Sequence, residues 1–101
     1  MAASPTFLDE AIEELVDAVI YYEAEAPPGT AQRLAFEANA IIQRVTEAPR
    51  RWPVEENGYR RWRLVTFPYS WRFEVNDADE IRFVASVHAR RRLGYFKNRG
   101  R

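Results

Sequence analysis

The sequence predicts an α+β fold, in which an N-terminal hairpin of two helices packs on one face of a small antiparallel β-sheet. In the first half of the chain, apolar residues recur every three or four positions, which is the spacing of amphipathic helices. In the second half, aromatic and β-branched residues alternate with polar ones, which is the spacing of strands. The chain has 101 residues, so we expect one domain, over residues 1–101, with a single core.

Two helices are expected in the first half. The first runs from Phe7 to about Glu25, and the second follows Thr30 and ends before Pro49. The sequence APPGT at 26–30 separates them, because proline cannot continue a helix and glycine turns the chain. Thr30 is the expected N-cap of the second helix, and the short loop makes the two helices an antiparallel hairpin.

Three strands are expected in the second half, at residues 58–67, 69–75 and 81–88. Pro68 separates the first two strands, and the polar sequence NDADE at 76–80 forms a turn between the last two. Because these connections are short, neighbouring strands should pair in the antiparallel sense.

Strict alternation assigns the strand side chains to two faces. One face is apolar and is expected to pack on the helices. The other face is expected to be open to solvent, and its positive charge continues beyond the last strand in Arg90, Arg91 and Arg92. The open face is expected to carry Arg61, Arg63, Ser70, Arg72, Arg82, Ser86 and His88.

The formal net charge is zero, but the charges are unevenly distributed along the chain. Residues 1–48 hold nine acidic residues and two arginines, whereas residues 49–101 hold six acidic and thirteen basic residues. This asymmetry favours an anionic partner for the second half. The alternative is that oppositely charged faces of the folded chain neutralise each other.

Several classes of site and location are not expected. The chain has no cysteine, which excludes disulfides and thiolate chemistry and fits a reducing cytoplasm. It has a single histidine and no phosphate-binding or nucleophile motif, so we expect no metal site and no cofactor. No apolar run has the length of a membrane span, and the first residues lack the features of a signal peptide. We therefore expect a cytoplasmic protein without a membrane partner.

Clustered arginines suit a polyanion, because each guanidinium presents a planar fork of donors to a phosphate or carboxylate. Tyr95 and Phe96 would add a stacking surface for a base. The alternative is that these arginines only solvate the outer face of an antiparallel sheet. The expected anion-binding or target-binding residues are Arg61, Arg63, Arg72, Arg82, Arg90, Arg91, Arg92 and Phe96.

Three stretches in order resemble the RelE/ParE superfamily of bacterial type II toxins, often labelled plasmid stabilisation proteins: YYEAEAPPGTAQRL, RRWRLVTFPYSWRFEV and IRFVASVHARRRLGYFKNR. The resemblance runs from about Phe7 to Arg99 and implies a helix hairpin on an antiparallel sheet. Family members usually begin with an extra strand. Here only AASPTF is available for it, and Pro5 makes a poor central strand, so this strand should be short or lost.

The resemblance implies a toxin that a cognate antitoxin holds inactive, by wrapping it with a helix and an extended segment. ParE-like members inhibit DNA gyrase, whereas RelE-like members cleave messenger RNA on the ribosome. The ordinary net charge, the absence of lysine from the expected strands, and Ser70 in place of a RelE-like arginine favour the ParE-like reading.

The alternative is a metal-independent, RelE-like endoribonuclease. The resemblance then matches its basic positions to Arg61, Arg63 and Arg90, with its terminal tyrosine at Phe96 or Tyr95. Because arginine stays protonated, His88 or Tyr95 would have to accept the proton from the 2′-hydroxyl. The catalytic residues expected in this case alone are His88, Arg90, Tyr95 and Arg63.

Three aromatic residues outside the main apolar pattern admit two interpretations. Trp52, Tyr59 and Phe96 are either contacts for the antitoxin or parts of a satellite core.

Overall fold

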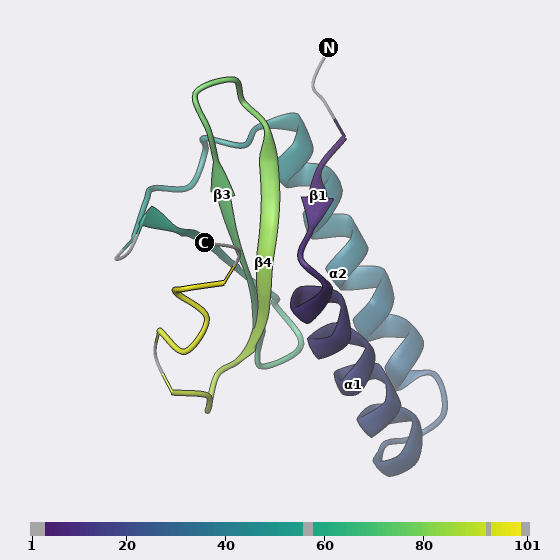
Figure 1. Cartoon of the computed structure of the whole chain (residues 1–101). Coiled ribbons are helices and arrows are strands. Elements are labelled where there is room, and N and C mark those ends of the chain that lie inside the picture. The colour runs from purple at the N-terminus through teal and green to yellow at the C-terminus, as the bar shows by residue number, and fades with distance from the viewer. Residues whose placement is uncertain (1–3, 56–57, 93, 100–101) are drawn as a thin grey trace.

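The computed structural model describes residues 4–55, 58–92 and 94–99, and Figure 1 shows its helices beside a twisted sheet. The predicted α+β fold, with a helix hairpin on one face of the sheet, is confirmed. In the described part of the chain, no helix has the length and apolar character needed to cross a membrane. The elements in chain order are β1 (Thr6–Phe7), α1 (Asp9–Glu25), α2 (Thr30–Glu47), β2 (Arg60–Arg63), β3 (Tyr69–Val75) and β4 (Ile81–His88).

The sheet is mixed rather than wholly antiparallel. Its strand order is β1-β4-β3-β2, and the pairs β2–β3 and β3–β4 are antiparallel as expected. β1 pairs in parallel with β4, with Thr6 opposite Arg82 and Phe7 opposite Phe83. The extra N-terminal strand is therefore present but short. It covers only the first part of the outer edge of β4.

The ends of two elements differ from the expectation. β2 spans four residues rather than 58–67, because the N–H groups beyond it, at Val65 and Thr66, donate to the carboxylate of Glu37 on α2. At the start of α2, Gly29 with φ 92° takes the N-cap position expected for Thr30, which is already helical. Glycine suits that position because its backbone enters the left-handed region at little steric cost.

The main core lies between the helices and the sheet. Trp71 is buried there, and its indole N–H donates to the carbonyl of Ala38 on α2 at 3.1 Å, so its polar atom is satisfied. Phe83 contacts it edge-on, with ring centroids 5.1 Å apart. The buried members of this core are Ala11, Ala18, Leu34, Ala38, Ile41, Val45, Leu64, Phe67, Trp71, Phe73, Ile81 and Phe83.

A β-bulge at Val84 exchanges the two faces of β4 partway along the strand. Phe73 lies opposite Phe83, but the preceding residue, Arg72, lies opposite Ala85, so Val84 is an extra residue in β4. After an extra residue every side chain moves to the other face. The expectation that Ser86 points to the open face was therefore wrong, because Ser86 pairs with Trp71, which faces the helices. His88 pairs with Tyr69 on the helix side, but at the end of β4 it also lines a hollow beside Arg61 and Arg63.

A second, smaller core covers β4 on the face opposite the helices. Tyr59 and Phe96 are only 1% and 4% exposed, and the Tyr59 hydroxyl donates to the carbonyl of Lys97 at 2.9 Å. The C-terminal segment, residues 94–99, thus packs on a face that was expected to be open (yellow in Figure 1). Tyr59 and Phe96 belong to a satellite core, and Trp52 packs on Trp62 with ring centroids 3.4 Å apart. The buried members of this second core are Tyr59, Val84, Ala85, Val87 and Phe96.

Candidate anion-binding site

A hollow of about 240 Å³ lies where β2 ends, β3 begins and the chain leaves β4. We call it the basic hollow, because arginines dominate its polar lining. Four of the seven arginines expected to bind an anion line it, and of these Arg72 is buried. Its polar lining comes from Arg61, Arg63, Ser70, Arg72, His88 and Arg91.

Arg72 is the buried centre of the basic hollow, only 8% exposed. Its Nε donates to the Ser70 hydroxyl at 3.4 Å, and its guanidinium lies over the Phe96 ring, 5.4 Å from the centroid. Burial lowers the pKa of Arg72, and the charge of nearby Arg61 lowers it further. Arginine nevertheless stays charged at neutral pH, so a bound anion would gain a desolvated donor.

Glu55 is the counter-ion of the basic hollow. One carboxylate oxygen lies 3.1 Å from Nη2 of Arg61, and the other lies 3.5 Å from Nη1 of Arg72. An anionic ligand must therefore share these two arginines with Glu55 or displace it. Sequence reasoning missed Glu55, because a single acid in the loop before β2 has no periodicity or motif that marks it.

Arg63 and Arg91 are the exposed cations of the basic hollow. Arg63 lies opposite Ser70 in the β2–β3 pair, and Arg91 stacks on the Tyr95 ring, with its guanidinium carbon 4.1 Å from the centroid. Within residues 4–55, 58–92 and 94–99, no ion pair holds either guanidinium. These two side chains are the ones that a ligand reaches without competing with Glu55.

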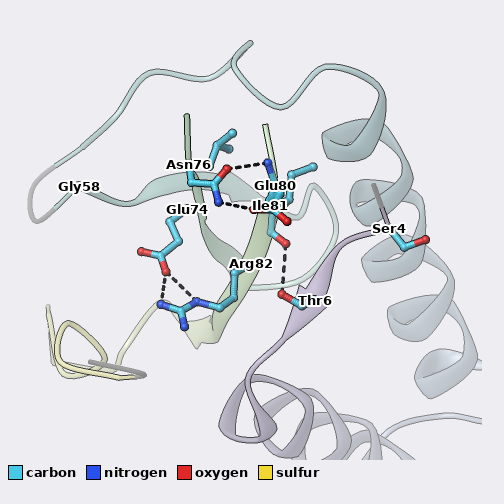
Figure 2. Close-up of a pocket in the computed structure, with 9 residues that line it drawn as sticks. Ser4, Thr6, Gly58, Glu74, Asn76, Glu80, Ile81 and Arg82 are labelled. Atoms are coloured by element: carbon cyan, nitrogen blue, oxygen red, sulfur yellow. Dashed lines mark hydrogen bonds and ion pairs between the residues drawn. The ribbon is translucent and has the colours of Figure 1, made fainter. Parts of the chain in front are cut away.

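Three of the expected anion-binding arginines do not line the basic hollow. Arg82 lies at the other end of the sheet, where its guanidinium pairs with Glu74 beside the turn at Asn76 (Figure 2). Arg90 and Arg92 are exposed and stand outside the lining. Phe96 does line the hollow, but its ring is buried beneath Arg72 and offers no free stacking surface.

The residues expected for an endoribonuclease are not gathered around one point. Arg63 lines the basic hollow, whereas Tyr95 lines a separate hollow against α1, and His88 lines both. His88 Nδ1 accepts the backbone N–H of Arg90 at 3.0 Å, so that nitrogen is occupied. The Tyr95 hydroxyl donates to Glu14, and burial followed by this bond raises the pKa of Tyr95. A tyrosine with a raised pKa stays protonated at neutral pH, so it is a poor general base.

The raised pKa of Tyr95 predicts a loss of stability in alkali. Above pH 10, about the ordinary pKa of tyrosine, the unfolded chain releases the Tyr95 proton while the folded chain keeps it, so stability falls as pH rises. One such group contributes about 1.4 kcal/mol per pH unit. Urea unfolding at about pH 8 and again at about pH 11, on either side of the ordinary tyrosine pKa, should show this decline. Tyr95→Phe should make the decline shallower, and an unchanged slope would contradict the assignment.

Comparison with known proteins identifies the fold. No protein-family model and no curated protein matches the sequence. A solved structure described as the chromosomal ParDE TA system from P. aeruginosa contains a chain that superimposes with a TM-score of 0.73. The alignment covers 86% of this chain and 96% of that chain, at 19% sequence identity. The chain has the fold of that protein. At this identity the likeness establishes the fold alone, and this is the fold that the sequence resemblance implied.

Proposed function

We propose that the chain is the ParE-like toxin of a bacterial type II toxin–antitoxin system. In this proposal it acts in the cytoplasm as an inhibitor of DNA gyrase, and a cognate antitoxin neutralises it. The observation that carries the proposal is the structural likeness to a chain of a ParDE system over 86% of the sequence. The three sequence stretches that resemble the same superfamily support it independently of the fold, because they are features of the amino-acid sequence alone.

The site favours inhibition by binding over cleavage of RNA. The basic hollow gathers arginines, which bind anions but cannot act as bases at neutral pH. Tyr95 keeps its proton through Glu14. Of the four residues expected for an endoribonuclease, Arg63, His88 and Tyr95 are divided between two hollows, and Arg90 lines neither of them. A binding inhibitor needs no general base, so this arrangement suits the ParE-like function better than the RelE-like one.

The proposed contact uses the exposed guanidinium groups first. Arg63 and Arg91 would meet a carboxylate or phosphate of the target at the mouth of the basic hollow. Arg72, held by Ser70 and Phe96, is already in place and loses little conformational freedom on binding. Glu55 would be displaced as the anion enters, which releases Arg61 for the same contact.

Induced expression in a bacterial host is expected to arrest growth and to trigger a DNA-damage response, while messenger RNA stays intact. Primer extension on abundant transcripts and a damage-responsive reporter measure the two outcomes in one culture. Cleavage in phase with codons would replace the ParE-like proposal with the RelE-like one. Normal growth at a verified level of folded protein would contradict the toxin proposal as a whole.

A further inference from the structure

An apolar groove of about 620 Å³ lies between α2 and the chain that follows β2. Two large apolar side chains border it and face solvent: Phe36 is 76% exposed and Val65 is 95% exposed. Exposed apolar side chains that gather along one groove mark an interaction surface more often than isolated ones do. We call it the α2 groove, defined by Arg33, Phe36, Ala40 and Arg44 on α2 and by Trp62 and Val65 across from them.

The spacing of residues on α2 shapes this groove. Arg33, Phe36, Ala40 and Arg44 follow one another at intervals of three, four and four residues, so they lie along one face of the helix. The small side chain of Ala40 leaves room in the middle. The two arginines stand about 16 Å apart along the axis, at about 1.5 Å per residue. The groove is thus apolar along its length and positively charged toward both ends.

The charge of the α2 groove is positive on balance, because two arginines and one acid, Glu37, line it. The Glu37 carboxylate accepts the backbone N–H groups of Val65 and Thr66 and forms no ion pair with either arginine in the described part of the chain. In the part of the chain that the structure describes, neither Arg33 nor Arg44 has an ion-pair partner. An occupant with carboxylates at its two ends would complement these arginines.

We propose that the α2 groove docks an acidic amphipathic segment of a second protein. Apolar side chains of that segment occupy the space over Ala40, between Phe36 and Val65, and its carboxylates pair with Arg33 and Arg44. The inference goes beyond the proposed function, because the groove alone carries it. Under the proposed function the antitoxin is the natural source of such a segment, and that identification alone rests on the function.

A second copy of this chain is a weaker candidate for the same groove. Its α1 exposes Ile12, Val16 and Ile20 in a stripe next to acidic residues, and this resembles the required segment. Docking α1 of one copy into the α2 groove of another is a head-to-tail contact between different surfaces. Such contacts continue into open chains unless their rotation closes a ring. We therefore assign the groove to a different protein.

Two synthetic peptides test the docking proposal. Both carry leucines on one helical face, and the flanking positions are glutamate in one peptide and lysine in the other. Titration into the folded chain, followed by amide chemical shifts, should locate the glutamate peptide at Phe36, Ala40 and Val65. The lysine peptide should bind at least tenfold more weakly, which corresponds to about 1.4 kcal/mol.

Matched variants separate the groove from the overall charge. Arg33→Glu with Arg44→Glu should reverse the preference between the peptides, while Arg90→Glu with Arg92→Glu, an equal charge change outside the groove, should leave the glutamate preference in place. Ala40→Trp should fill the groove and abolish binding of both peptides, and the unfolding transition shows whether that variant remains folded.

Several results would overturn the docking proposal. They are equal binding of the two peptides, no binding of either, shifts confined to other surfaces, or self-association of the free chain through the groove. These results are independent of growth arrest. A chain that binds the glutamate peptide but never arrests growth contradicts the proposed function and leaves the docking proposal standing.

Discussion

Reversing the charge of Arg63 and Arg91 together is expected to abolish growth arrest, while the same reversal at Arg90 and Arg92 leaves arrest nearly intact. Arg63 and Arg91 line the basic hollow, and the other two arginines lie outside it. Each charge-assisted bond to a target anion contributes about 1.5–3 kcal/mol, so losing two weakens binding at least about a hundredfold. The introduced carboxylates would also repel the anion.

Dilution plating at matched expression levels measures this effect, and urea unfolding shows that both double variants are folded. All four side chains are exposed, so neither variant should lose much stability. Equal loss of arrest in the two variants would mean that the arginine run after β4, and not the basic hollow, contacts the target. Full arrest by Arg63→Glu with Arg91→Glu would remove the basic hollow from the proposed mechanism.

The helices and the two longer strands were predictable because their side-chain periods match their burial. β3 and β4 occupy the predicted ranges 69–75 and 81–88, and Asn76 joins them through a turn in which its side chain accepts the N–H groups of Ala78 and Glu80. β2 was overestimated because β-branched and aromatic residues, which favour strands, continue beyond it in Val65, Thr66 and Phe67. The tertiary bonds to Glu37 that end the strand have no local signal.

The candidate site was predicted only in part, and the bulge at Val84 is the main reason. Alternation places Val84, Ser86 and His88 on one face, but the extra residue leaves Val84 on that face and moves the other two to the helix side. Valine is a common strand residue, so the residue type at this position does not indicate a bulge. The arginines of β2 and β3 lie outside the bulge, and for them the predicted face is the observed one.

The polar partners of the site were also beyond sequence reasoning. Glu55 lies in the loop before β2 and binds Arg61 and Arg72, and Glu14 on α1 binds Arg99 near the other end of the chain. Both read as ordinary acidic surface residues in the sequence. The role of Glu14 depends on the C-terminal segment, which returns over the sheet and brings Tyr95 and Arg99 to its carboxylate.

Glu14 on α1 completes the outer edge of β4 where β1 does not reach. One carboxylate oxygen accepts the backbone N–H of Ser86 at 3.1 Å, and Arg99 donates to the carbonyl of Val84 at 3.1 Å. Arg99 also donates to both oxygens of Glu14, at 2.7 and 3.1 Å, and the Tyr95 hydroxyl donates to the second oxygen. These side chains supply the bonds that a neighbouring strand would otherwise make.

Replacing Glu14 with alanine is expected to destabilise the chain by about 3 kcal/mol, a large part of the stability of a domain of this size. The Glu14 and Arg99 side chains are each only 17% exposed, so the change leaves a mostly buried cation and the Ser86 N–H without their acceptor. Glu13→Ala is the matched control, because Glu13 is the exposed neighbour on the same helix. The change from glutamate to alanine alters the helix propensity of α1 equally in the two variants. Urea unfolding measures the difference between the two variants.

A double variant tests whether Glu14 and Arg99 act together. Arg99→Ala should lower the free energy of unfolding by less when Glu14 is already alanine, because the partner is then absent. Additive losses in that double variant would mean that the carboxylate and the guanidinium do not act together, and that the C-terminal segment is held by its apolar contacts alone.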